Sequence, residues 1–162
     1  MVRGKSMDWL LNNLRLRLFT WFKVPLIAYL GPVVERLDDR RCVLRIPLRR
    51  RSRNHLASMY LGALTTGAET TVGVVAFSRI QKRGLRVSVV QRAFTAEFHA
   101  RATGDVHFVC DEVEVVHGLL DQAAATSDRV EGLVRVRALV PDQRGDDPVA
   151  DFTFTLSVRS KR

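Results

Sequence analysis

Apolar residues in the first part of the chain recur at helical spacing. Over residues 7–22 they stand three or four positions apart, which predicts an amphipathic helix. They are Leu10, Leu11, Leu14, Leu18, Trp21 and Phe22. The helix should end at Lys23, because the residue before Pro25 avoids the helical region. Two placements are open for it: packing against its own domain or a subunit interface, or a weak contact with a membrane surface, with Trp and Arg among the headgroups.

Three further stretches alternate between apolar and polar residues, which is typical of half-buried strands. Residues 33–48 predict a hairpin that turns at Asp38-Asp39. Residues 131–140 and 149–159 predict two more strands, joined by a turn rich in Asp, Gly and Pro. The apolar faces of these strands are formed by Cys42, Leu44, Ile46 and Leu48, by Val134, Val136, Ala138 and Val140, and by Ala150, Phe152, Phe154, Leu156 and Val158.

A long strand is predicted over residues 85–102, and its apolar phase changes partway. Apolar residues occupy odd positions up to Val89 and even positions from Phe94, so a bulge is expected near residues 91–93. Residues 105–115 read as a strand that pairs with it through a turn at 103–105. Residues 117–128 are either a loop or a short helix.

The central helix is predicted over residues 58–77. On a helical net Leu61, Leu64, Ala68, Val72 and Val75 form an apolar packing stripe, while Gly62, Thr65, Thr66, Glu69 and Gly73 form a second stripe of small and polar residues. The full pattern predicts an α+β fold in one domain over 1–162. We expect a curved antiparallel sheet of five to six strands wrapped around one long central helix, with an extra N-terminal helix.

Glu69 is the unusual residue of the central helix, because burying a charge is costly unless a partner compensates it or a function uses it. It could hold an internal hydrogen bond, pair with a basic residue, or face a functional cleft. Three glycines in the same helix, Gly62, Gly67 and Gly73, each cost about 1 kcal/mol relative to alanine. They indicate close approach of a sheet, a neighbouring helix or a ligand.

Composition narrows the function classes. The 162 residues carry a net charge of +9, which favours anionic partners or is simply a solubilising surface. No aromatic and basic strand motif of the RNA-binding kind is present, so no specific nucleic acid is expected. The four histidines lack metal-ligand spacing, so no metal site is expected. Cys42 and Cys110 read as small buried hydrophobes, and the N-terminus lacks a signal-peptide pattern, which favours a cytoplasmic protein.

The segment from Asn54 to Glu69 resembles the motif of PaaI-type acyl-CoA thioesterases of the hotdog superfamily, and more closely the DUF4442 family of that superfamily. The thioesterase motif has an asparagine, a His-Gly-Gly six residues later at the start of the central helix, and an acid nine residues beyond the histidine. Asn54, Tyr60-Leu61-Gly62 and Glu69 stand at these places without a gap. Tyrosine replaces the histidine, and leucine replaces the first glycine.

The resemblance implies a hotdog fold and hydrolysis of acyl-CoA or a similar thioester, with coenzyme A as part of the substrate and no separate cofactor. It also implies a homodimer or tetramer whose sites form between subunits. Glu69 would be general base or nucleophile, the Gly62 N–H would stabilise the oxyanion, and Asn54 and Tyr60 would orient water or the carbonyl. The loss of His-Gly favours the alternative of a non-catalytic acyl-CoA-binding protein.

Five further residues are candidates for substrate contact, each with a simpler interpretation beside it. Thr65 and Thr66 could touch the substrate or bond their own helix. Arg51 and Arg53 could bind the phosphates of coenzyme A or belong to a solvated basic loop. His55 lies beside Asn54 and could reach the site.

Overall fold

A computed structural model describes residues 3–126 and 128–161, with the side chains of 3–9 left aside. The elements, in chain order, are α1 (Arg3–Lys23), α2 (Pro25–Leu30), β1 (Val33–Leu37), β2 (Cys42–Ile46), α3 (Leu61–Arg83), β3 (Val87–Phe98), β4 (Val106–Cys110), α4 (Val113–Ala125), β5 (Val130–Leu139), α5 (Pro141–Arg144) and β6 (Pro148–Ser160).

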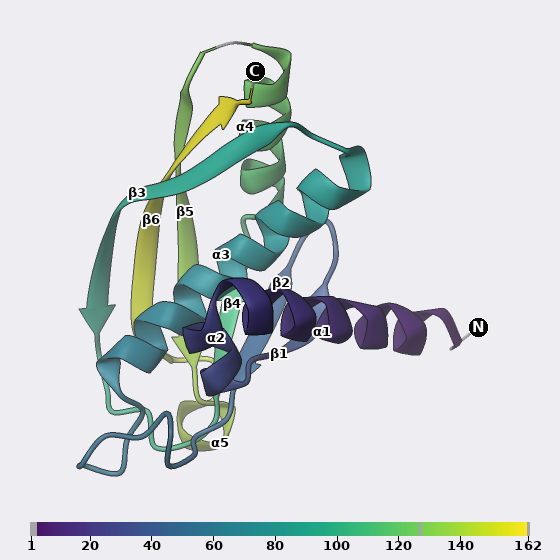
Figure 1. Cartoon of the computed structure of the whole chain (residues 1–162). Helices are drawn as coiled ribbons and strands as arrows, with labels where there is room; N and C mark the ends of the chain where they lie inside the picture. Colours follow the sequence, from purple (N-terminus) through teal and green to yellow (C-terminus); the bar gives the residue numbers. More distant parts are fainter. Residues whose placement is uncertain (1–2, 127, 162) are drawn as a thin grey trace.

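The strands form one antiparallel sheet in the order β1-β2-β4-β5-β6-β3, which curves around α3 (Figure 1). The predicted bulge is present, since the pairing of β3 with β6 shifts register between Gln91 and Ala93. Because of the extra residue, the side chains on the inner face of β3 change from odd-numbered to even-numbered positions, as the sequence indicated. The sheet therefore curls over the helix, and the predicted architecture is confirmed.

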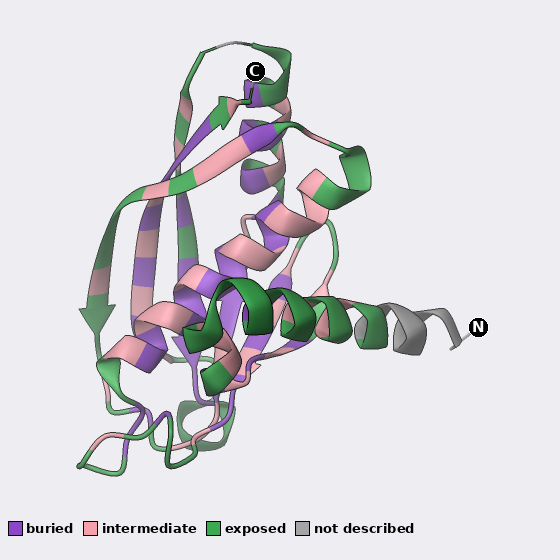
Figure 2. Cartoon of the chain, in the orientation of Figure 1, coloured by how far each residue is buried: buried purple, intermediate pink, exposed green. Residues whose placement is uncertain are grey.

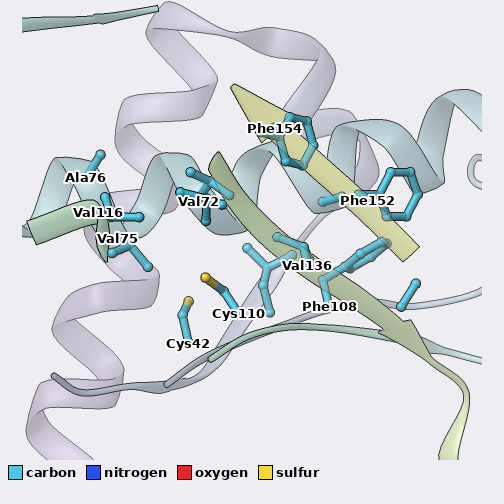
Figure 3. Close-up of a cluster of buried hydrophobic side chains, with 14 of the residues drawn as sticks. Cys42, Val72, Val75, Ala76, Phe108, Cys110, Val116, Val136, Phe152 and Phe154 are labelled. Atoms are coloured by element: carbon cyan, nitrogen blue, oxygen red, sulfur yellow. The ribbon is translucent and has the colours of Figure 1, made fainter. Parts of the chain in front are cut away.

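The core lies between α3 and the inner face of the sheet (Figure 3). Phe108, Phe152 and Phe154 are fully buried there, and so are Val72 and Val75 of α3. Gly67 lies where this helix approaches β4, and a Cβ there would clash with the Phe108 ring. Close packing therefore explains this glycine.

The two cysteines face each other across the β2–β4 ladder, as register partners. Both are free thiols and fully buried, so their predicted role as small apolar residues is confirmed (Figure 3). Burial raises the pKa of the Cys110 thiol to about 11.

Two predictions about the middle of the chain are wrong. β4 does not pair with the long strand before it, because residues 99–105 cross the end of the sheet and place β4 between β2 and β5. Residues 113–115 are helical rather than extended. They open α4, whose buried residues lie at helical spacing: Val113, Val116, Leu119, Leu120 and Ala123. The Val-Glu-Val alternation was too short to distinguish the two-residue period of a strand from the 3.6-residue period of a helix.

The central helix is displaced relative to its predicted range of 58–77. It begins at Leu61, because Met59 is tied to the neighbouring chain by its N–H bond to the Ala102 carbonyl and Tyr60 has extended dihedrals. It continues to Arg83 and ends at Gly84, whose φ of 60° is the left-handed conformation of a helix C-cap. Leu61 is 54% exposed and does not join the predicted packing stripe, whose other four members are buried.

The predicted N-terminal helix is present as α1, and it ends at Lys23 as expected. It packs on the outer side of α3, where the rings of Phe19 and Phe77 lie 4.9 Å apart. The Asn13 side chain pairs with the backbone N–H and carbonyl of Val34, at 2.9 Å each. The six apolar residues that predicted the helix do not make this contact and are exposed (Figure 2).

Candidate functional site

The carboxylate of Glu69 lies on one side of α3, at the face turned toward β3. All five members of the small and polar stripe are half-buried, namely Gly62, Thr65, Thr66, Glu69 and Gly73. They contrast with Leu64, Ala68, Val72 and Val75, which are buried on the sheet side of the same helix. The stripe is therefore a partly open face of the helix, as the sequence indicated.

The partner of Glu69 is an amide and not a basic residue. Nε2 of Gln91 donates a hydrogen bond to Oε1 of Glu69 at 3.2 Å. Gln91 is the last inward residue of β3 before the bulge, and it stands opposite Leu156 on the inner face. The bulge thus points a polar side chain at the carboxylate from an otherwise apolar surface.

Gln91 was missed by the sequence reasoning, although a signal was present. It occupies an inward, odd-numbered position of a strand whose other inward residues are apolar, at the point where the phase changes. A polar residue at such a place needs a partner. Only the fold reveals that this partner is Glu69.

The electrostatic setting of Glu69 favours its neutral form. No lysine, arginine or histidine forms an ion pair with it in the part of the chain that the structure describes. Burial consequently raises the pKa of the Glu69 carboxyl above its ordinary value of 4.5. A carboxylate of raised pKa is a stronger base than an exposed one.

The start of α3 carries Tyr60 and Gly62 close together. Tyr60 is the residue before the first helical turn, and its N–H donates to the Ser52 carbonyl at 2.8 Å. Its ring is 58% exposed and lies over Gly62, where a Cβ would come within 2.6 Å of the ring. The Leu61 and Gly62 amides belong to the first turn, where N–H groups lack intrahelical acceptors.

Asn54 organises its own loop. Its Oδ1 accepts hydrogen bonds from the Leu56 N–H at 2.9 Å, and from the N–H and hydroxyl of Ser58 at 3.2 Å each. These bonds shape the turn that leads into α3. The side-chain oxygen of Asn54 is thus engaged within the loop, while Nδ2 has no protein partner among the described residues.

The remaining candidate residues divide between the loop and the helix. The Thr65 hydroxyl donates to the Leu61 carbonyl at 3.0 Å, which is the local alternative considered for it. Thr66 is half-buried beside Glu69 on the stripe, and its carbonyl accepts from Thr70. His55 and Arg53 are exposed in the loop. Arg51 turns toward α2, with its guanidinium 6.0 Å from the centre of the Tyr29 ring.

Within this chain, the two halves of the motif lie too far apart to contact the same small group of a substrate. Glu69 stands seven residues after Gly62 on the same helix, which corresponds to about 10 Å along the axis. Gln91 joins Glu69, whereas Asn54 and Tyr60 stay with the start of the helix. Beyond Glu69 lies β3, an edge strand of 12 residues that, among the described strands, pairs only with β6.

Solved structures with the same architecture define the class of fold. A candidate thioesterase from Shewanella oneidensis superposes with a TM-score of 0.76 at 14% identity, covering 91% of this chain and 97% of its own. A Pseudomonas aeruginosa protein of unknown function, provisionally named a thioesterase, gives 0.73 at 25% identity, covering 90% and 93%. A thioesterase from Haemophilus influenzae gives 0.64 at 12% identity, covering 88% of each chain. The protein has the hotdog fold.

Within this class the family is established by sequence. Residues 13–158 match the family described as "Domain of unknown function (DUF4442)", so the chain belongs to the DUF4442 family. The match includes both Asn54 and Glu69. A search of curated proteins gave no match.

Proposed function

We propose that the protein is an acyl-thioester hydrolase acting on acyl-CoA or a similar carrier thioester. The carrying observation is the half-buried Glu69 carboxyl, which has a raised pKa, an amide from Gln91 as its partner, and a place on the open face of the central helix. Structural neighbours that bear thioesterase names support the same class of reaction.

Glu69 acts in this proposal as the general base. Water attacks the thioester carbonyl while its proton passes to the Glu69 carboxylate. The tetrahedral intermediate then collapses, the C–S bond breaks, and the departing thiolate takes up the proton. The Gln91 amide orients the carboxylate throughout. Direct attack by Glu69, with an anhydride intermediate, is the nucleophilic variant of this scheme.

The oxyanion site is supplied by the start of α3 in a second subunit. The free first-turn amides at Gly62 and the positive end of the helix dipole suit a developing negative charge. Because Gly62 and Glu69 of one chain are about 10 Å apart, the two halves meet only across a dimer. Tyr60 and Asn54 would orient the carbonyl from that second subunit, with Thr66 beside Glu69.

The homodimer itself is supported by the sheet edge. Within the part of the chain that the structure describes, no strand pairs with the outer edge of β3, and folded proteins rarely leave so long an edge uncovered. Phe94 and Phe98 lie on the inner face of β3 and remain half exposed, at 51% and 48%. A second copy pairing at β3 would cover both rings and close the face that carries Glu69.

The basic loop before α3 suits the phosphates of coenzyme A. Arg53 is exposed close to Asn54 and has no ion pair among the described residues. Arg51 is already turned toward Tyr29, so Arg53 is the stronger candidate of the two. His55 and Thr65 complete the proposed contacts of the substrate.

Thiol release from acyl-CoAs of short, medium and long chain tests the proposal. Wild-type turnover should fall by about 10²–10⁴-fold in Glu69→Gln, which removes the base but retains the shape. Gln91→Ala should cause a smaller loss. Glu114→Gln, at an exposed carboxylate of α4, is the matched control and should retain full activity. Equal turnover in Glu69→Gln and wild type would refute the assignment of Glu69.

Binding without turnover is the second candidate function. It is favoured by Tyr60 and Leu61, which stand where the thioesterase motif has His-Gly, and by the Tyr60 ring, which lies over Gly62. The same acyl-CoA panel separates the two functions. Saturable binding that is accompanied by no thiol release at any chain length would select the acyl-CoA-binding protein.

A further inference from the structure

The N-terminal helix shows two apolar faces, and the broader one points away from the protein. The face toward the body contains Asn13, Leu16 and the buried Thr20, with Phe19 at its side. At 3.6 residues per turn, the six apolar residues that predicted this helix point in nearly the opposite direction, away from the body. They are Leu10, Leu11, Leu14, Leu18, Trp21 and Phe22.

This outer face is the largest concentration of exposed apolar side chains on the described surface. Ten of the 18 large exposed hydrophobic residues of this surface fall between residues 10 and 29, and six of these ten form the outer face of α1. Trp21 and Phe22 are 71% and 74% exposed. Figure 2 shows the exposed side of α1. Apolar patches of this kind mark interaction sites rather than ordinary surface.

The apolar face continues across the bend into α2. Trp21, Pro25, Ala28 and Tyr29 line a shallow hollow of about 430 Å³. The guanidinium of Arg51 stands over the Tyr29 ring at its edge. Leu26 and Tyr29 are 61% and 59% exposed, so both helices present apolar groups outward.

The charges that border this face are all positive. Arg15 and Arg17 lie on opposite flanks of the stripe, and Lys23 stands at the end of α1. Residues 10–34 contain no Asp or Glu. None of these three basic side chains forms an ion pair among the residues described by the structure. The uncompensated charge therefore remains available to an anionic partner.

We propose that α1 and α2 dock on the surface of a bilayer containing anionic lipids. Leu, Trp and Phe side chains would enter the boundary between headgroups and acyl chains, while Arg15, Arg17, Lys23 and Arg51 would contact lipid phosphates. Such a division of apolar and basic residues is typical of helices that lie in the membrane interface. Among the described residues no helix has the length and apolarity needed to cross a bilayer.

A second copy of the chain fits this face less well. In a twofold contact the same surface meets itself, so Arg15, Arg17 and Lys23 of both copies would gather at one interface, and residues 10–34 hold no carboxylate to offset them. A bilayer supplies the opposite charge and the apolar phase together.

Vesicle binding tests the proposal with the full chain. Flotation with vesicles of phosphatidylcholine containing about one third phosphatidylglycerol should recover the protein, whereas pure phosphatidylcholine vesicles should recover much less. Neutralising Arg15 or Arg17 with glutamine should weaken binding about fivefold for each charge. Raised salt should weaken it further, because it screens the attraction.

The apolar half of the interaction is tested with the double variant Trp21→Ala/Phe22→Ala. It should lose vesicle binding, while the control Leu133→Ala, at an exposed leucine of β5 outside this face, should retain it. Circular dichroism and thermal unfolding of both variants show that they are folded. In Trp9→Phe, which leaves Trp21 as the single tryptophan, anionic vesicles should shift the emission to shorter wavelength.

Several outcomes would overturn the proposal. These are no vesicle binding by the wild type, equal binding by the Trp21→Ala/Phe22→Ala variant, or loss of oligomers in that variant without any vesicle binding. The last outcome would assign the face to a second copy. The proposal is independent of the hydrolase activity, since binding to vesicles by a protein that releases no thiol would retain it and reject only the enzyme.

Discussion

At the scale of single residues, Glu69 was singled out by the sequence, and the structure shows which side chain is its partner. Its place in an apolar helix predicted a compensated or functional carboxylate, and the structure supplies an amide from Gln91 at 3.2 Å as its only hydrogen-bond partner among the described residues. An amide satisfies one oxygen but leaves the charge uncompensated. Burial raises the pKa of this carboxyl, so its ionisation costs stability.

The pH dependence of stability follows from this cost. Because the pKa of Glu69 is higher in the folded than in the unfolded chain, the folded state binds the proton more tightly. The free energy of unfolding contributed by this residue should therefore fall as pH rises from about the ordinary 4.5 through the raised value. Glu69→Gln removes the ionisation and should unfold at a higher temperature than wild type at pH 7.5.

Thermal unfolding at pH 7.5 and pH 4 measures the effect. At pH 4 the two proteins should be nearly equal, because Glu69 is largely protonated in both states of the wild type. Asp146→Asn, at an exposed carboxylate before β6 that forms no ion pair among the described residues, should shift neither melting temperature. A lower melting temperature for Glu69→Gln at pH 7.5 would mean that the ionised carboxylate stabilises the fold.

At the scale of elements, the glycines of α3 have different reasons for being there. Gly67 is enclosed by the Phe108 ring and Ile46, so closeness of helix and sheet requires it. Gly73 lies on the face of Glu69, and a Cβ there would meet no atom of the chain within 4 Å. The sequence could not separate these two cases, because both glycines stand in the same helix.

The two glycines should respond oppositely to alanine. Gly67→Ala forces a methyl group into the core and should lower the free energy of unfolding by about 1–3 kcal/mol. Gly73→Ala should raise the stability of the subunit by up to about 1 kcal/mol, through the better helix propensity of alanine. Denaturant unfolding of the two variants measures the contrast, and destabilisation of similar size in both would contradict it.

Element pairing shows where local patterns stop being informative. The bulge of β3 was predictable from a phase change within one strand. The pairing of β3 with β6 joins segments about 60 residues apart, and nothing in either strand specifies the other. The helix α4 was obscured because Val113 and Val115 alternate like a strand for three residues before the helical spacing begins.

At the scale of the whole molecule, the edge strand β3 links the proposed dimer to the proposed site. Phe94 on its inner face stacks with Phe154 at 5.8 Å and still has half its surface exposed. Covering this surface by a second copy would also bring a second helix start toward Glu69. A substitution that prevents dimer formation at β3 should therefore also abolish activity.

Phe94→Glu tests this coupling. Light scattering should show a dimer for wild type and a monomer for the variant, since a charge would enter the covered face. Leu133→Glu is the matched control, because Leu133 is 55% exposed against 51% for Phe94 but lies on β5, away from the edge. A Phe94→Glu protein that still forms dimers would place the subunit contact elsewhere.

The sequence by itself determined the periodic elements and the residues that are candidates for the chemistry. Alternation placed the buried faces of β2, β5 and β6, helical spacing placed α1 and α3, and motif spacing singled out Asn54 and Glu69. These features are local, because strand and helix periods repeat within a few residues. They were sufficient to predict a curved sheet around one helix.

Tertiary structure decided the rest, since it depends on contacts between distant segments. It brought Gln91 to Glu69, inserted β4 between β2 and β5, and turned the six apolar residues of α1 outward. A helical period reveals that a face is apolar but not which way it points. That choice depends on the surfaces available to it, and the body of the protein takes the narrower face of α1.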